Sequence, residues 1–299
     1  MSGSNESNKV IVAANPVSGQ RGNRRLVERL SAALIAGGLE PRVIWDQVER
    51  KALLSQADLS EGYRCVIVAG GDGTVGDVLN EQPALPLAVA PLGTENLFAR
   101  EFGFTRDMER LAQAVRRCDC RTIDLGLVNG RRFSLMVSAG FDSEVVRRAT
   151  LARRRHGVCV GRGGRAAFFG PALSTLFRYR YPRVRLEADG QTWEGAHVFI
   201  FNVHQYAMDL KFVPDARSDD GMLDWLVMER PGLRRLIGYF MAVRGGRCHT
   251  RPDVRHGRAR KIRITSLEPV PLQVDGDAGG WVPAEVGILP STVRLVKCG

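Results

Sequence analysis

The first 120 residues alternate short aliphatic runs with amphipathic segments. Residues 9–14, 64–69 and 86–90 are rich in Val, Ile, Leu and Ala, which is typical of strands buried on both faces of a parallel sheet. A further strand is expected at 40–45. Segments with helical spacing are found at about 22–37, 74–80, 96–101 and 107–117. The alternation predicts a doubly wound α/β domain, in which helices cover a parallel sheet.

The pattern changes after Gly126 to short strand-like runs that are broken by Gly and Asp. Many short strands of this kind indicate an antiparallel β-sandwich. A basic helical insert is expected at about 143–179. The expected strands are 132–137, 184–188, 196–203, 223–228, 261–265 and 272–274. We therefore expect an α/β nucleotide-binding domain at 1–124, with residues 1–8 as a disordered tail, and a β-sandwich at 125–299 whose last strand is a candidate to return to the first domain.

One strand-to-helix junction is unusually rich in glycine. The run ending at Ala69 leads into Gly70-Gly71-Asp72-Gly73-Thr74, which we call the GGDGT turn. Glycines permit positive φ and let backbone N–H groups approach a polyphosphate, and Thr74 suits the N-cap of the next helix. The alternative is a structural turn with Asp72 as its cap. Short motifs match by chance, so the turn needs support from other segments.

Three other segments provide that support. The runs 15–19 and 91–100 each follow an aliphatic strand, and ligands of parallel sheets bind at the carboxyl ends of strands. We therefore expect these two segments and the GGDGT turn to meet at one nucleotide. The third segment, 214–224, places four carboxylates around one glycine.

Together the four segments resemble the diacylglycerol kinase catalytic-domain superfamily, which includes bacterial lipid kinases, sphingosine kinases and ceramide kinase. The resemblance extends from about Val10 to about Asp277. It implies a nucleotide-binding α/β domain that resembles NAD kinase, a β-sandwich after it, and an active site in the cleft between them. The implied activity is transfer of the γ-phosphate of ATP, with Mg²⁺, to a hydroxyl of diacylglycerol, a sphingoid base or a related lipid.

Phosphoryl transfer needs phosphate-binding groups, a divalent cation and a carboxylate beside the acceptor hydroxyl. Asp72 and Asp124 are expected just beyond apolar strands, where they would hold Mg²⁺ directly or through its waters. Asp220 resembles the main ligand of a second, structural Mg²⁺, although Arg217 is an alternative partner for this acidic turn. The expected nucleotide-binding residues are Asn15, Ser18, Gly19, Gly70, Gly71, Gly73, Thr74, Gly93, Thr94, Asn96 and Asp277.

Asp275 is the preferred candidate for the base, because Asp275-Gly276-Asp277 matches the D-G-E segment that faces the γ-phosphate in the family. Asp72 is the rival candidate. Asp-Gly is also a common hairpin turn, and without the other motifs that reading would prevail.

The sequence departs from the bacterial pattern at three places. Leu97 stands where the family usually has Asp, Asp277 replaces Glu, and 202–208 lacks the expected glycines. Two alternatives therefore stay open: a kinase-like module that binds nucleotide or lipid without turnover, and an NAD kinase, which shares the GGDGT turn. The segments 91–100 and 214–224 favour the lipid kinase.

Charge and cysteine content bear on partners and compartment. The 299 residues include 43 Lys and Arg against 32 Asp and Glu, a net charge of +11. Arginines concentrate at 147–165, next to Phe168 and Phe169, a mixture that suits peripheral contact with an anionic membrane; a solvated helix face is the alternative. No helix-turn-helix, zinc-finger or RNP pattern indicates nucleic acid. The six cysteines form no C-x-x-C pair and no apolar run is long enough to span a bilayer, so we expect a cytoplasmic protein that visits the inner face of the membrane.

Overall fold

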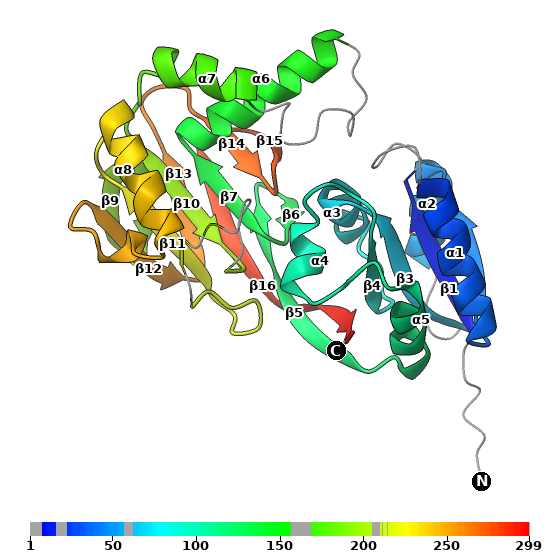
Figure 1. Cartoon of the computed structure of the whole chain (residues 1–299). Coiled ribbons are helices and arrows are strands. Elements are labelled where there is room, and N and C mark those ends of the chain that lie inside the picture. The colour runs from blue at the N-terminus through cyan, green and yellow to red at the C-terminus, as the bar shows by residue number, and fades with distance from the viewer. Residues whose placement is uncertain are drawn as a thin grey trace. The chain divides into compact units, whose positions relative to one another are not determined.

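The computed structural model describes residues 8–15, 23–56, 62–156, 169–204, 210, 212–213 and 215–298, and the predicted tail 1–8 lies almost entirely outside them. The described residues form two compact units (Figure 1). Unit 1 contains the chain up to Ile123 together with the segment from Thr292 onwards. The described part of unit 2 runs from Asp124 to Ser291.

Unit 1 is the predicted parallel sheet covered by helices. Its strands lie in the order β2 (Glu40–Ile44), β1 (Lys9–Ala14), β3 (Tyr63–Gly70) and β4 (Leu87–Pro91), and the last part of β16 (Ala284–Val296) pairs in parallel with β4. The aliphatic residues of β1, β3 and β4 are buried, as their patterns predicted. The helices are α1 (Asn23–Ala36), α2 (Gln47–Gln56), α3 (Asp72–Asn80), α4 (Leu97–Glu101) and α5 (Met108–Arg117).

Helix α2 was not predicted, because its buried face carries a charge. Only Arg50 and Leu54 of this helix are buried. The Arg50 guanidinium pairs with Glu81, at 2.6 Å between Nη2 and Oε1, and the two side chains are only 4% and 7% exposed. A hydrophobicity pattern predicts that both residues of a buried ion pair lie on the surface. The buried face of α2 therefore gave no apolar signal, and the helix was missed.

Unit 2 is a β-sandwich, as predicted. One sheet is antiparallel, in the order β12 (Val254–Ala259), β11 (Leu223–Met228), β10 (His197–Phe201), β7 (Met136–Ala139), β14 (Pro271–Val274) and β15 (Asp277–Trp281). The other sheet carries β13 (Lys261–Thr265), β8 (Val184–Ala188), β9 (Gln191–Gly195), β5 (Cys120–Val128), β6 (Arg131–Phe133) and the first part of β16. Their facing side chains, among them Phe133, Ile200, Trp225, Ile262 and Leu272, form the core.

Helices α6 (Phe141–His156), α7 (Phe169–Arg178) and α8 (Leu233–Arg244) complete unit 2 (Figure 1). Helices α6 and α7 are the described parts of the predicted basic insert, and α6 packs against α7 and strands β7, β14 and β15. Helix α8 was not predicted. None of the helices in the described part of the chain is long and apolar enough to cross a membrane.

Candidate active site

The GGDGT turn opens helix α3 two residues earlier than the sequence suggested. Gly71 is the N-cap, α3 begins at Asp72, and Thr74 lies buried in the first turn, so the prediction that Thr74 is the N-cap was wrong. Thr74 Oγ1 instead accepts a hydrogen bond from Asn15 Nδ2 at 3.2 Å. The ends of β1 and β3 therefore lie next to each other, as expected for loops at the carboxyl edge of a sheet. Ser18 and Gly19 lie outside the described residues.

The glycines of this turn serve close packing. Gly70, Gly71, Gly73 and Gly93 all lie outside the positive-φ region, so that part of the sequence argument was wrong. A Cβ added at Gly93 would lie 2.5 Å from Cα of Gly71, and one at Gly70 would overlap Thr74. The loops after β3 and β4 therefore meet backbone to backbone, and only glycine allows this distance. Gly73 and Thr94 are exposed at the same loops.

Asp72 joins the GGDGT turn to the segment after β4. Its carboxylate accepts hydrogen bonds from the amides of Leu97 (3.0 Å) and Phe98 (2.9 Å), at the start of α4. Burial raises the pKa of Asp72, and the two amide hydrogen bonds oppose that rise. Leu97, which replaces the usual Asp, thus contributes its backbone N–H. Asn96 is held at φ 50° and exchanges two hydrogen bonds with Gly93, at 2.8 and 2.9 Å.

Arg106 is a residue of this loop region that sequence reasoning missed. Its Nε donates to the carbonyl of Pro91 (3.0 Å) and its Nη2 donates to that of Gly93 (3.1 Å). A permanent positive charge therefore sits beside the loop that meets Gly71. No motif marks this arginine, because its role depends on a fold contact thirteen residues away.

In unit 2, Asp275 occupies the hairpin turn between β14 and β15, where it has φ 48° and Gly276 has φ 86°. The turn is the expected Asp-Gly hairpin, but the side chain does more than turn the chain. The carboxylate accepts from the amides of Ser134 (2.8 Å), Leu135 (2.8 Å) and Met136 (2.9 Å), and from the Ser134 hydroxyl (3.2 Å). Burial raises the pKa of Asp275, and these hydrogen bonds oppose the rise.

This arrangement explains why the single strand predicted at 132–137 is wrong. The chain breaks at Ser134 and Leu135 into β6 and β7, because the amides there point to the Asp275 carboxylate. Asp277, two residues further on, is exposed and lies 3.4 Å from Arg131, measured between Oδ2 and Nη2.

Asp124 lies inside β5, so its predicted position just beyond a strand was wrong. The carboxylate is buried and accepts from the amides of Gly221 and Ser291, each at 2.7 Å. Buried Asn202, which sequence reasoning did not single out, donates to the carbonyls of Asp124 (2.9 Å) and Ser134 (3.0 Å). Asn202 therefore connects the surroundings of Asp124 with those of Asp275.

The acidic segment after Asp215 is compensated by arginines. Arg258 pairs with Asp220 and lies 3.5 Å from Asp224, between Nε and Oδ1, while Arg217 pairs with Asp219 at 3.0 Å. Burial raises the pKa of Asp224 to about 6, and Arg258 opposes this. Arg217, which was the predicted alternative partner of this segment, therefore pairs with Asp219. Asp220, which was predicted to hold a structural Mg²⁺, pairs with Arg258. As they stand, these residues do not fit a cation at Asp220.

No group of three His, Cys, Asp or Glu side chains in the described ranges comes together as a metal site. Mg²⁺ in kinases is typically held by one or two carboxylates and the phosphates of the nucleotide, with no cage of protein ligands. Asp72, at the meeting point of the loops after β3 and β4, fits that mode. The carboxylate of Asp124 is already engaged by two amides.

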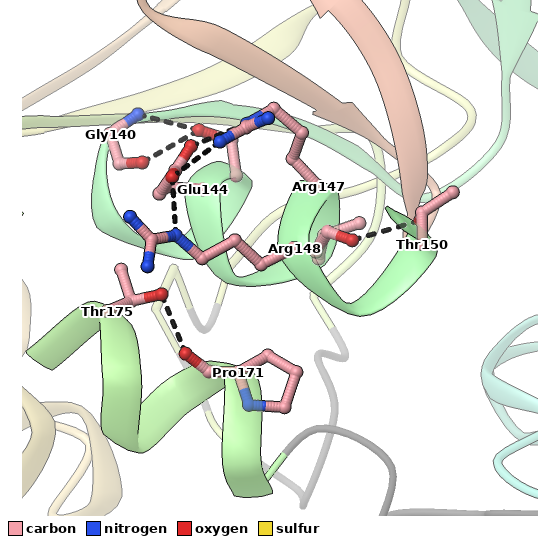
Figure 2. A network of polar contacts seen from close by, with 9 residues as sticks. Gly140, Glu144, Arg147, Arg148, Thr150, Pro171 and Thr175 are labelled. Carbon is pink, nitrogen blue, oxygen red and sulfur yellow. Dashed lines mark hydrogen bonds and ion pairs between the residues drawn. The ribbon is translucent and has the colours of Figure 1, made fainter. Parts of the chain in front are cut away.

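The start of the predicted basic region is neutralised in part (Figure 2). Glu144 pairs with Arg147 at 2.7 Å and with Arg148 at 2.6 Å. Burial tends to raise the pKa of Glu144, but the two guanidinium groups outweigh it and hold the pKa below its usual range. Arg147 also lies over the ring of Trp281, 5.6 Å from its centroid. The side chains of 153–156 and all of 157–168 lie outside the described residues.

Comparison with known proteins shows which family the chain resembles. Residues 9–128 match the model of the diacylglycerol kinase catalytic domain, and residues 135–297 match that of the YegS C-terminal NAD kinase beta sandwich-like domain. Proteins named diacylglycerol kinase from Staphylococcus carnosus (strain TM300) and Staphylococcus aureus (strain bovine RF122 / ET3-1) are each 30% identical to this chain. The alignments cover 90% of this chain and 89% and 86% of the relatives, respectively.

A crystal structure titled as a diacylglycerol kinase from Bacillus anthracis str. Sterne superposes with a TM-score of 0.71 at 19% identity, covering 97% of each chain. That likeness supports the two-unit fold. The sequence matches extend over both units, so the chain belongs to the diacylglycerol kinase family, in which a diacylglycerol kinase catalytic domain is followed by a YegS-type β-sandwich.

Proposed function

We propose that this protein is an ATP- and Mg²⁺-dependent lipid kinase, which transfers the γ-phosphate of ATP to a hydroxyl group of diacylglycerol, a sphingoid base or a related lipid. The observation that carries the proposal is the contact of Asp72 with the start of α4. It joins two loops that both follow parallel strands, at the edge where such sheets bind ligands.

Unit 1 has the features needed to bind a nucleoside triphosphate. The close approach of Gly71 to Gly93 brings the loops after β3 and β4 together with no Cβ between them, and exposed Gly73 and Thr94 lie beside this contact. Arg106 adds a fixed positive charge to the same loops. We therefore assign the nucleotide phosphates to this part of unit 1, with Asn15, Thr74 and Asn96 positioning the loops.

Mg²⁺ bound to the nucleotide would offset phosphate charge during transfer. Asp72 is the residue we assign to it, directly or through water, because this carboxylate lies at the phosphate loops and is not paired with an arginine in the described residues. We assign Asp124 a positioning role: it ties β5 to the acidic segment and to Ser291 within β16.

Asp275 is our candidate for the base in unit 2. A carboxylate offers about four acceptor positions, and the four described donors fill them. The Ser134 hydroxyl makes the longest of these contacts, 3.2 Å, and it is the only donor that can rotate away. We propose that the acceptor hydroxyl of the lipid replaces it, which leaves the three amides to hold Asp275 in place.

The lipid acceptor implies that the protein works at a membrane surface. We place the protein in the cytoplasm, in peripheral contact with the inner face of the membrane. The region 147–165 is one candidate contact, although Arg147 and Arg148 share their charge with Glu144.

Transfer of radiolabelled phosphate from ATP and Mg²⁺ into mixed micelles tests the proposal. The panel contains diacylglycerol, monoacylglycerol, phosphatidylglycerol, sphingosine and ceramide, with soluble NAD as a separate acceptor. Label in one lipid class establishes the kinase and its acceptor. Label in NAD alone moves the chain to the NAD kinase alternative. If the folded protein binds ATP but transfers label to none of these acceptors, the chain is the non-catalytic binding module.

A further inference from the structure

Helix α8 presents large apolar side chains to solvent. It buries Tyr239 and Val243, whereas Ile237, Phe240 and Met241 are 55%, 42% and 62% exposed. At 100° per residue the three exposed side chains share one face of the helix, opposite the buried pair. A surface helix of a soluble domain normally keeps polar residues on that face.

An arginine lies at each end of this apolar face along the helix. Arg234 lies one turn before Ile237, and Arg244 lies one turn after Met241; both are exposed. The 22 residues from 230 to 251 contain six arginines and no acidic residue. In the described part of the chain no carboxylate pairs with Arg234 or Arg244, unlike Arg235, which lies 3.7 Å from Asp253.

A basic cavity lies at the N-terminal end of α8. It has a volume of about 340 Å³ and is lined by Arg230, Arg235, Arg251 and Arg255 together with two carboxylates, Glu229 and Asp253. Arg251 and Arg255 are paired with these carboxylates, at 2.9 and 2.7 Å. The lining keeps a net positive charge, which suits a phosphate-bearing headgroup.

We propose that the outer face of α8 docks on the surface of an anionic lipid bilayer. Helices that lie in the membrane interface combine exposed aromatic and aliphatic side chains with neighbouring arginines. The apolar side chains enter the region where the acyl chains begin, while the guanidinium groups stay beside the lipid phosphates. If two copies of the chain paired symmetrically through this face, the arginines at its ends would lie next to arginines of the other copy. Repulsion between these like charges disfavours self-association through α8.

Docking of α8 on a bilayer does not depend on kinase activity. Only the measurement of diacylglycerol turnover described below rests on the proposed function. Docking through α8 places the membrane contact in a different part of unit 2 from the region 147–165. The described arginines of that region, Arg147 and Arg148, are paired with Glu144, whereas Arg234 and Arg244 have no acidic partner among the described residues.

Vesicle binding by the full chain, without ATP, is the direct test. Vesicles of phosphatidylcholine with 30% phosphatidylglycerol are compared with pure phosphatidylcholine by co-sedimentation. We expect the wild type to prefer the anionic vesicles, and Ile237→Ser/Phe240→Ser/Met241→Ser to bind them at least about ten-fold more weakly. The matched control removes exposed apolar residues elsewhere, Ile35→Ser/Val48→Ser/Leu267→Ser, and should bind as the wild type does.

A second pair of variants tests the contribution of charge. Arg234→Gln/Arg244→Gln removes the two arginines of α8, and Arg260→Gln/Arg263→Gln removes two exposed arginines elsewhere as the control. At about 1 kcal/mol per arginine near an anionic surface, loss of the α8 pair should weaken binding by roughly 30-fold and flatten its salt dependence. Thermal melts of every variant confirm that folding is intact.

Three outcomes overturn the proposal. They are equal binding of the α8 variants and their controls, loss of binding only in Arg153→Gln/Arg154→Gln/Arg155→Gln, and conversion of a dimer to a monomer by the α8 triple variant in gel filtration. If the kinase assignment holds, the α8 triple variant keeps its turnover of monomeric short-chain diacylglycerol and loses it on vesicles. If no acceptor is phosphorylated, the kinase proposal fails while the vesicle result still decides the docking.

Discussion

Replacing Asp72 by Asn tests the contact that joins the GGDGT turn to the segment after β4. The variant keeps the side-chain shape and one acceptor oxygen, but it turns an NH₂ group towards the amide of Leu97 or Phe98. A hydrogen bond to a charged acceptor contributes about 1.5–3 kcal/mol, and burial of the charge, which raises the pKa of Asp72, returns part of that. We expect about 2 kcal/mol lower stability, or roughly 3 °C in Tm for a chain of 299 residues.

Activity should fall far more than stability. A carboxylate that holds nucleotide-bound Mg²⁺ acts through its charge, so Asp72→Asn should lower kcat/KM by at least about 100-fold. The control is Asp46→Ala. The Asp46 Oδ1 caps α2 by accepting from the amides of Val48 and Glu49, both at 2.9 Å, at an exposed site in the same unit. Its loss should cost about 1 kcal/mol without changing turnover.

Thermal unfolding and labelled-phosphate transfer are measured on both variants across a range of Mg²⁺ concentrations. Turnover of Asp72→Asn that matches Asp46→Ala would refute the assignment of Asp72 to phosphate and metal. A drop in Tm with unchanged transfer would leave Asp72 as a purely structural link between the loops.

Three further predictions concern His197, the Arg50–Glu81 ion pair and the Ser134–Asp275 hydrogen bond. Burial lowers the pKa of His197 to about 4, so the native state stays neutral while the unfolded chain gains a proton below about 6.5. The resulting stability is complete above pH 6.5 and is lost as the pH falls towards 4. Between pH 7 and pH 5 the wild type should lose about 2 kcal/mol more than His197→Gln in urea unfolding, and parallel losses would contradict this. Glu81→Gln should cost about 3 kcal/mol by leaving Arg50 buried without its partner, and Arg50→Met/Glu81→Leu should recover most of it; chemical denaturation of both variants decides. Ser134→Ala should keep kcat within about three-fold, because the substrate hydroxyl replaces this donor, whereas Asp275→Asn should lose at least about 100-fold; similar losses in steady-state assays would exclude the exchange.

The central strands of unit 1 were predictable because they are continuous apolar runs, whereas the polar strands β9, β12 and β15 of unit 2 were missed. β1, β3 and β4 were found within a residue or two. α2 was missed because Arg50 and Glu81 neutralise each other in space. α8 was missed because its exposed face is as apolar as its buried face, so no periodic contrast marks the helix.

The candidate site was predictable as a set of motifs, while its contacts were not. The GGDGT turn identified Asp72 from the residue types alone. Its partners Leu97 and Phe98 use backbone N–H groups, which any residue supplies, so no side chain signals them. The same reason hid the amides that hold Asp275. Arg258 lies 38 residues from Asp220, and the sequence does not show that they pair.

The route of the last strand constrains how the chain can fold during synthesis. β16 leaves unit 2 at Ser291, and its final residues complete unit 1: Leu295 pairs with Leu87, the Lys297 amide donates to the carbonyl of Asp119 at 2.8 Å, and Arg110 donates to that of Cys298 at 2.8 Å. Although β1, β3 and β4 are translated first, the β4 edge of their sheet stays unpaired until the ribosome has made the end of β16. A nascent chain stalled before residue 292 would expose that edge to other chains, so unit 1 is protected only after β16 has been made.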